Sequence, residues 1–492
     1  MARALLAVLL VAMAVSGLIF VGGLQLALAT NVSSIIASDT TWTKANSPYN
    51  LVGNVLVNNG VTLTIEPGVT VNLNSYYIMV NGTLTARGTS DDQIRFNGGS
   101  ITFNSNSVSW NEQTGSGCII ENAILTGTVL SSSNTVKINL DTIDTGFTVS
   151  SSTIVSNNNI KGDVNGGIIT SNTIVGGVTS ATILNNVITG NVGCTGVTSN
   201  NFIKGGINVN GNCLVSNNTI TGGLASSGSD YSGDAIFMGS PYVYGGGYPK
   251  IENNLITNST VGIDISVLIR DWFVANIPLI QDNQITENGV GIRYSIVTQE
   301  SYGTAPPTTI QNNTITKNGV GIEFVGSTQE YQIVNNNIQD NTNYNIYLQN
   351  TPNDVNVTYN WWGTADSQTI SQTIYDYNKD FNLGKVNFSP FLTASNPQAM
   401  PTTNPPVLDT TTPTATPTEI PVQTPSSTPT PTPSTSHNPT TAPQTPAGTG
   451  TQVIAQDWPY IVIIVLVAVI VVMAAVVFRG RKRSIQNTNV SV

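Results

Sequence analysis

The middle of the chain alternates apolar and polar positions in short runs. Runs of β-branched residues, a few positions long, each end at Asn or Gly, and none of them has the 3.6-residue period of a helix. Asn and Gly are the residues that best tolerate a positive φ. The pattern therefore predicts short β-strands separated by tight corners.

One phrase, Asn-Asn-x-Ile, sets the period of these strands. Its anchor isoleucines step by 14, 14, 15, 17, 36, 29, 30 and 23 residues, at Ile160, Ile174, Ile188, Ile203, Ile220, Ile256, Ile285, Ile315 and Ile338. A second phrase, Val-Gly-Ile, follows the later anchors. Repeated strands and corners wind a chain into a solenoid that buries Ile and Val between coils. Asn residues at one corner are expected to stack, with their amides bonded along the axis. The expected fold class is all-β, a parallel β-helix, over residues 30–394.

Both ends of such a solenoid need caps, expected near 38–100 and 355–392. Alternating strands with corners at Glu66-Pro67-Gly68 and Asn81-Gly82 open the first of these segments. The second contains Trp361 and Trp362, and we expect both indoles to cover the apolar cross-section of the last coil.

The termini predict export and anchoring. Residues 1–29 have a basic start, a long apolar run and an Ala-x-Ala exit, which together describe a signal peptide; an uncleaved signal anchor is the alternative. Residues 458–478 are predicted to be a transmembrane helix, with a buried core helix as the alternative, and the basic residues of 479–492 indicate a cytoplasmic tail. Residues 395–457 hold most of the prolines and much Thr, which predicts a disordered, extended stalk.

Composition narrows the possible functions. Only 9% of residues are charged, the net charge is −10, and the one His, His437, lies in the Pro/Thr stretch. Setting aside five basic residues at the two termini leaves 12 basic and 27 acidic residues, so the expected exported part carries −15. This balance excludes a nucleic-acid partner and a His-based metal or acid–base site.

Long steps between anchors place extra residues at one phase of the repeat, at 225–250, 266–279, 296–309 and 326–331. Insertions at one phase emerge on one side of a solenoid. The sequence therefore predicts a face built from loops that are rich in aromatic residues.

Several motifs together resemble a known group. The opening Gly60–Gly68 stretch, the Asn-Asn-x-Ile repeats and the Tyr-Asn-Trp-Trp-Gly ending at 359–363 resemble right-handed parallel β-helix cell-surface proteins of the archaeal type. They are also similar to the β-helix domains of periplasmic copper-binding, carbohydrate-binding and sugar-hydrolase proteins. The resemblance covers about residues 38–392. It implies the right-handed fold, but the copper-linked relatives would be expected to have His or Met ligands, and the repeats contain no His.

Candidate chemistry falls on the insertions. Clustered acidic residues beside an Arg would suit polysaccharide cleavage, and the weak catalytic candidates are Asp230, Asp234, Arg270 and Asp271. Solvated loop charges are the alternative. Aromatic rings stack on sugar faces, so the binding candidates are Tyr242, Tyr244, Tyr248 and Trp272; packing of the loops is the alternative. No cofactor is expected, and Asp91-Asp92 gives only a weak signal for Ca²⁺.

The remaining candidates concern covalent modification. Cys194 and Cys213 fall in neighbouring coils but not level with each other, so a disulfide between them stays open, and Cys118 is expected to be buried. Asn-x-Ser/Thr sequons, which allow N-glycosylation or arise by chance in an Asn-rich chain, occur at Asn31, Asn81, Asn217, Asn258, Asn312, Asn356 and Asn387.

These features favour a single-pass protein of the cell membrane with an extracellular β-helix and a cytoplasmic tail. The expected function is display of a loop-built face that binds glycans or envelope proteins, without catalysis. A polysaccharide lyase or glycoside hydrolase and a purely structural envelope component remain the alternatives.

Overall fold

The computed structural model describes residues 29–131, 134–222, 233–239, 248–271, 278–301, 308–326 and 331–406. All of them belong to the first of two compact units, Met1–Pro413. The expected signal peptide (apart from Ala29), most of the stalk, the expected membrane span and the basic tail lie outside the described residues.

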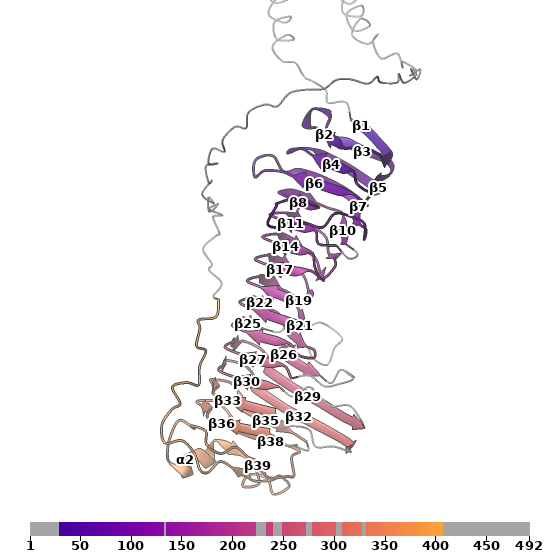
Figure 1. The fold of residues 1–492 in the computed structure, drawn as a ribbon. Helices are drawn as coiled ribbons and strands as arrows, with labels where there is room; N and C mark the ends of the chain where they lie inside the picture. Colours follow the sequence, from indigo (N-terminus) through magenta and orange to yellow (C-terminus); the bar gives the residue numbers. More distant parts are fainter. Residues whose placement is uncertain are drawn as a thin grey trace, which may run out of the picture. The chain divides into compact units, whose positions relative to one another are not determined.

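The described chain is a solenoid whose successive coils stack their strands into three parallel sheets (Figure 1). Sheet 1 contains β2 (Thr40–Trp42), β4 (Thr62–Ile65), β6 (Thr83–Arg87), β8 (Ile119–Glu121), β11 (Lys137–Asn139), β14 (Ile154–Ser156), β17 (Ile168–Thr170), the second halves of β19 (Val178–Leu184) and β21 (Val192–Ser199), β24 (Leu214–Ser216), β27 (Lys250–Glu252), β30 (Leu279–Gln281), β33 (Thr308–Gln311) and β36 (Tyr331–Val334).

Sheet 2 carries the anchor isoleucines, and all nine are buried. Its strands are β9 (Ala123–Leu125), β12 (Thr142–Ile143), β15 (Asn159–Lys161), β18 (Thr173–Val175), β20 (Val187–Thr189), β22 (Phe202–Lys204), β25 (Thr219–Thr221), β28 (Leu255–Thr257), β31 (Gln284–Thr286), β34 (Thr314–Thr316) and β37 (Asn337–Gln339). The anchors pair in register from coil to coil, even across the 14-residue steps.

Sheet 3 contains the longest strands of the later coils. It comprises β10 (Thr128–Ser131), β13 (Phe147–Thr148), β16 (Val164–Asn165), the first halves of β19 and β21, β23 (Ile207–Val209), β26 (Asp234–Gly239), β29 (Val261–Asp271), β32 (Val290–Ser301), β35 (Val320–Val325), β38 (Tyr344–Gln349) and β40 (Ile374–Tyr375). In the first coils, sheets 2 and 3 are joined by long bent strands: β1 (Thr30–Ile36), β3 (Tyr49–Val57), β5 (Thr70–Val80) and β7 (Ile94–Phe103). A 3-10 turn, η1 (Lys44–Asn46), precedes β3.

A buried asparagine ladder runs along the corner between sheets 1 and 2. Each rung donates its backbone N–H and its side-chain Nδ2 to the side-chain oxygen of the next rung, at about 3 Å, and the described rungs are Asn158, Asn172, Asn186, Asn201, Asn218, Asn254, Asn283, Asn313, Asn336 and Asn360. The amides also donate to strand carbonyls of the preceding coil, as Asn254 does to Val215 O at 3.0 Å. The predicted stacking of amides is therefore confirmed, and each rung satisfies backbone groups that a tight buried corner would otherwise leave unpaired.

The residue before each rung turns the chain. It has a positive φ at every described rung, for example 58° at Asn185 and 57° at Asn253. Asn accepts this left-handed conformation more readily than other residues that carry a Cβ. The Asn-Asn pair of the repeat thus has two roles: the first Asn makes the corner and the second makes the ladder.

The chain after residue 395 turns back along this same corner. The backbone N–H of Asn396 donates to Asn337 Oδ1 at 2.8 Å, and its side-chain amide donates to Asn312 Oδ1 at 3.2 Å. Ala399 is completely buried, and its carbonyl oxygen accepts a hydrogen bond from the Thr314 hydroxyl. We call residues 396–403 the strap.

The strap then crosses earlier coils. Thr402 bonds Asn253, and the Thr403 hydroxyl donates to Asn217 Oδ1 at 2.6 Å. It lies along the side of the solenoid away from β29 and β32 (Figure 1). The expected stalk therefore does not begin at 395, because its first residues dock on the β-helix through the amides of the corner.

The C-terminal cap differs from the expectation in one respect. Trp362 is buried and packs edge-on against Phe388, at 6.2 Å between ring centroids. The indole of Trp361 instead lies on the flank and donates to Gln339 Oε1 at 2.6 Å. One tryptophan covers the core, together with Ile370 of α2 (Ser367–Gln372) and a small pair of strands, β39 (Val355–Asn356) and β41 (Val386–Asn387).

The N-terminal end of the β-helix begins at residue 30, the expected start of the domain and ahead of the cap expected near 38–100. Strand β1 begins at Thr30 and pairs in parallel with β3, so the first coil opens before residue 38. Trp42 and Tyr49 stack at 4.9 Å within this end. Within the ranges described, no helix is long and apolar enough to cross a membrane, and the expected span at 458–478 lies beyond them.

Candidate functional site

A row of outward-facing residues crosses the late strands of sheet 3. Parallel pairing places them directly above one another, in the order Phe237, Asp264, Arg293, Glu323, Tyr347 and Tyr375. Strands of adjacent coils lie about 4.8 Å apart, so each side chain in this row contacts its neighbours. The row is charged in its middle and aromatic at its C-terminal end.

Arg293 lies between two carboxylates. Its Nη1 is 3.3 Å from Asp264 Oδ2, and its Nε donates to Glu323 Oε2 at 2.8 Å. The side chain of Arg293 is 32% exposed, whereas those of Asp264 and Glu323 are 6% and 11% exposed. One guanidinium therefore faces two largely buried carboxylates, and this group carries a net negative charge.

Asp234 joins this group from the start of β26. Burial is the main reason that the pKa of its carboxyl rises to about 7; the negative charge of Asp264 adds to the rise, and Arg293 opposes it. Asp234 and Asp264 thus form a close carboxyl pair in which one proton is held near neutral pH. The sequence assigned Asp234 to an insertion beside Asp230, but β26 is a core strand that pairs with β23 and β29.

Three tyrosines form a platform at the C-terminal end of the row. The ring of Tyr347 lies 4.9 Å from Tyr375 and 5.9 Å from Tyr344, at interplanar angles of 33° and 30°. Tyr344 and Tyr375 meet edge-on at 5.3 Å. Partial burial is the first reason that the pKa of Tyr347 is raised, and the adjacent Tyr375 and Glu323 add to it. The Tyr347 hydroxyl therefore stays neutral and can donate or accept a hydrogen bond at physiological pH.

A surface pocket of about 450 Å³ opens beside this platform. Its lining combines one aliphatic residue, one carboxylate, two aromatic rings and two exposed polar residues at the rim: Val320, Glu323, Tyr344, Tyr347, Thr342 and Asn343. Thr342 and Asn343 are exposed, and their backbone N–H groups bond the preceding coil at Asn318 and Gly319, at 2.8 Å each. The rim is thus fixed to the solenoid.

Two of the four catalytic candidates, Asp234 and Asp271, lie far apart along sheet 3. Asp230 lies outside the described residues, and only the backbone of Arg270 and Asp271, at the end of β29, is described. Asp271 is ten residues along β29 from Val261, the register partner of Asp234. At about 3.3 Å per residue, this is a separation of roughly 30 Å. Asp234 is therefore grouped with Asp264 and Arg293 and not with Asp271.

The four binding candidates are only partly described. Tyr242, Tyr244 and Trp272 lie outside the described residues. Tyr248 is 65% exposed, and its backbone N–H donates to Asn212 Oδ1 at 2.8 Å. Its ring takes part in no described stacking contact.

The expected insertions share a phase in part: residues 223–232 fall elsewhere, between β25 of sheet 2 and β26 of sheet 3. The four gaps at 240–247, 272–277, 302–307 and 327–330 each separate a strand of sheet 3 from the next strand of sheet 1. Parts of the expected loops are strand, however, because β29 and β32 pair up to Asp271 and Ser301. Backbone pairing between coils thus extends well into the segments that sequence spacing marked as loops.

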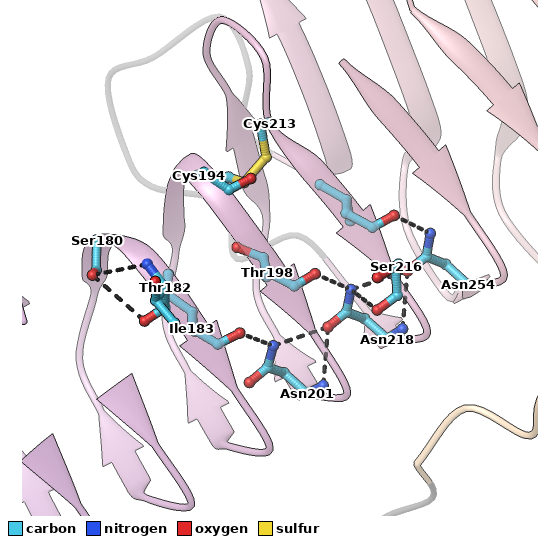
Figure 2. The surroundings of a disulfide bond; sticks show 12 residues. Ser180, Thr182, Ile183, Cys194, Thr198, Asn201, Cys213, Ser216, Asn218 and Asn254 are labelled. Carbon is cyan, nitrogen blue, oxygen red and sulfur yellow. Dashed lines mark hydrogen bonds between the residues drawn. A yellow bond between two sulfur atoms is a disulfide. The ribbon is translucent and has the colours of Figure 1, made fainter. Parts of the chain in front are cut away.

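Cys194 and Cys213 are joined by a disulfide across the corner between sheets 3 and 1 (Figure 2). Their Cα atoms are 5.9 Å apart and both residues are buried. Cys194 ends the first half of β21 and Cys213 precedes β24 of the next coil, so the bond spans the corner diagonally. Figure 2 also shows the ladder from Asn201 to Asn254 in the same coils. Cys118 is a buried free thiol, as expected.

The sequons divide into two sets. The asparagines of four are exposed: Asn31, Asn258, Asn356 and Asn387. The other three are half-buried, and their side-chain oxygens accept hydrogen bonds: Asn81 from Asn104, Asn217 from Thr403, and Asn312 from Asn396. The two sets therefore differ in the exposure of their asparagine residues and in the hydrogen bonds that their side chains accept.

The weak calcium candidate does not present a cation site. Asp92 Oδ1 lies 2.6 Å from Lys44 Nζ, so a lysine ammonium occupies the position next to this carboxylate. Among the described residues, no three or more His, Cys, Asp or Glu side chains cluster closely enough to hold a metal ion.

Sequence reasoning missed the platform and the charged row. A signal for the row existed, because each Val-Gly-Ile phrase is followed by a charged residue: Asp264, Arg293 and Glu323 in successive coils. Tyr347 follows the corresponding isoleucine of the next coil, where the phrase has changed to Tyr-Asn-Ile.

The three stacked sheets and the rows along them define a parallel β-helix repeat protein. The family model described as "Right handed beta helix region" matches residues 194–338, which include β23 to β35 and much of the charged row. No curated protein and no solved structure matched the chain.

Proposed function

We propose that the protein is a membrane-anchored cell-surface β-helix that binds glycans, without catalysis, on the C-terminal coils of sheet 3. The anchor in this proposal is the apolar segment 458–478, followed by the basic residues of 479–492. The acidic composition suits an exposed, soluble domain and not a nucleic-acid partner.

The tyrosine platform carries this proposal. Tyr344, Tyr347 and Tyr375 present neighbouring ring faces beside a pocket whose rim holds Thr342 and Asn343. Flat rings with hydrogen-bonding groups at their edges suit a sugar, which has an apolar face and a polar rim. The rings are already held against one another, so little side-chain entropy is lost on binding.

The solenoid supports the display role. The asparagine ladder joins every coil from Asn158 to Asn360, and the strap crosses five of these coils along the same corner. The strap itself lies along the corner between sheets 1 and 2 and leaves sheet 3 uncovered.

The test is a glycan array with the full chain in detergent. We expect a defined set of glycans to bind, and Tyr347→Ala to lose them. Tyr248→Ala is the matched control, since it removes an exposed tyrosine from the expected loop face. Loss of binding in the Tyr248 variant alone would move the site to that face. No binding by any glycan would contradict the proposal and favour a structural envelope component.

One observation favours a second candidate, cleavage of polysaccharides. Asp234 and Asp264 form a carboxyl pair beside Arg293, and a carboxyl that titrates near 7 can act as a general acid or base. Both carboxyls are largely buried, which argues against direct contact with a polymer. Incubating each array hit with the protein and with Asp234→Asn tests this candidate: shorter products that only the wild type forms would establish catalysis.

A further inference from the structure

The pocket beside Tyr347 has a carboxylate in its wall. Glu323 lines it, and its side chain is only 11% exposed. Its Oε2 accepts from Arg293, while Oε1 has no hydrogen-bond partner among the residues that the structure describes. A ligand that donates a hydrogen bond to the free oxygen of a largely buried carboxylate is stabilised by that bond, most strongly when the donor is charged.

The charges around this carboxylate favour a positive donor. Arg293 is shared between Glu323 and Asp264, so one positive charge faces two negative ones. No Lys or Arg lines the pocket among the described residues. The faces of Tyr344 and Tyr347 also attract cations. A sugar carboxylate placed here would lie beside Glu323 without a counter-ion.

The geometry points to a sugar unit with a free amino group as the preferred ligand of this pocket, an inference that rests on the proposed function. The ammonium donates to Glu323 Oε1, one face of the ring lies on Tyr347, and the hydroxyls reach Thr342 and Asn343. A lysine side chain offers the same ammonium but has no ring face to cover the platform, so the sugar fits the aromatic surface better.

The test compares four probes on the full-length protein by calorimetry in mildly acidic buffer. The probes are oligosaccharides of glucosamine, of N-acetylglucosamine and of galacturonate, and a lysine-containing peptide. We expect the glucosamine oligomer to bind most tightly and the galacturonate oligomer not at all. Glu323→Gln should weaken the glucosamine oligomer about tenfold, the effect of losing one charge-assisted hydrogen bond, and leave the N-acetyl form almost unchanged.

Two control variants, Glu112→Gln and Tyr347→Ala, separate the possible outcomes. Glu112→Gln removes the same charge from another ion pair, with Lys137, and should change neither affinity. Three results would overturn the inference: equal affinity for the amino and N-acetyl oligomers, equal loss of affinity for both in Glu323→Gln, or tightest binding of the peptide. If Tyr347→Ala still abolishes sugar binding in that case, the proposed function stands and only the preference for an amino sugar fails. If no sugar binds and Tyr347→Ala has no effect, the proposed function itself fails.

Discussion

Thr402 donates both its backbone N–H and its hydroxyl to Asn253 Oδ1, a residue 149 positions earlier, at 2.9 Å each. Asn253 is the corner residue that precedes the ladder rung Asn254, so one Asn-Asn pair bonds the neighbouring coils through its second residue and the strap through its first. The corner residues Asn217, Asn253 and Asn312, which bond the strap, are half-buried, whereas Asn157, Asn185 and Asn200, farther along the same corner, are exposed.

Removing this contact should release the strap. In Asn253→Ala, the amides of residues 396–403 should exchange with solvent faster, because two hydrogen bonds to Thr402 are lost. Asn185→Ala is the control: it has the same positive φ and thus the same backbone cost, but it lies in a coil that the strap does not bond. Hydrogen exchange followed by mass spectrometry measures both variants. If the strap amides are equally protected from exchange in Asn253→Ala and Asn185→Ala, Asn253 does not hold the strap on the solenoid.

Replacing a ladder asparagine should lower the stability of the fold much more than replacing a corner asparagine. The Asn254 side chain accepts from Asn218 and donates to Val215 O, Glu252 O and Asn283 Oδ1. Asn254→Ala leaves several of these buried groups without partners, and each such loss costs about 1–3 kcal/mol. We expect a clear fall in Tm by circular dichroism, larger than that of Asn253→Ala. A fall no larger than that of the corner variant would contradict a stabilising role for the ladder.

Asp141 occupies the ladder position before Asn158 and should make stability depend on pH. Its N–H donates to Asn158 Oδ1, its Oδ1 accepts from Ala123, and its buried Oδ2 has no partner in the described structure. Burial raises the pKa of this carboxyl well above its usual value. The native state therefore favours the proton: its contribution to stability is complete below the unfolded-state pKa, near 3.9, and is lost as pH rises through the native pKa.

Asp141→Asn supplies the amide that every later rung has. The variant should raise Tm at neutral pH, and the difference from the wild type should shrink in acid, where Asp141 is protonated in both states. Thermal unfolding at the two pH values checks this. A lower Tm at neutral pH would contradict a destabilising carboxyl at this position.

Glycosylation should follow the exposure of the sequons. After secretion from a cell that performs N-glycosylation, peptide mass spectrometry should find glycan on Asn31, Asn258, Asn356 and Asn387. Asn81, Asn217 and Asn312 should stay unmodified, because their amides are bonded and, for the last two, covered by the strap. Full occupancy of Asn217 would show that the strap is undocked when the glycan is added.

The repeat could be predicted from the sequence because each position of the repeat uses one residue type for one structural role. Asn makes the corner or the ladder, and Ile fills the core, so the spacing of Asn-Asn-x-Ile suffices for the fold. Strand β26 was not predicted, because segments on both sides of it stretch the step from Ile220 to Ile256 to 36 residues and conceal the strand.

The platform and the strap depend on relationships between coils. Tyr347 and Tyr375 are 28 positions apart in the sequence, and only the register of β38 with β40 places them side by side. Residues 396–403 resemble the rest of the Pro/Thr stretch in composition, and their docking depends on which corner amides lie within reach. A single repeat reveals neither relationship.

The most direct test of the account is hydroxyl-radical footprinting of the full chain, with and without a glycan found on the array. The account predicts that bound glycan protects Tyr344, Tyr347 and Tyr375 and leaves Tyr248 as reactive as before. Protection confined to Tyr242, Tyr244, Tyr248 and Trp272, with the platform unchanged, would contradict it and place binding on the inserted segments.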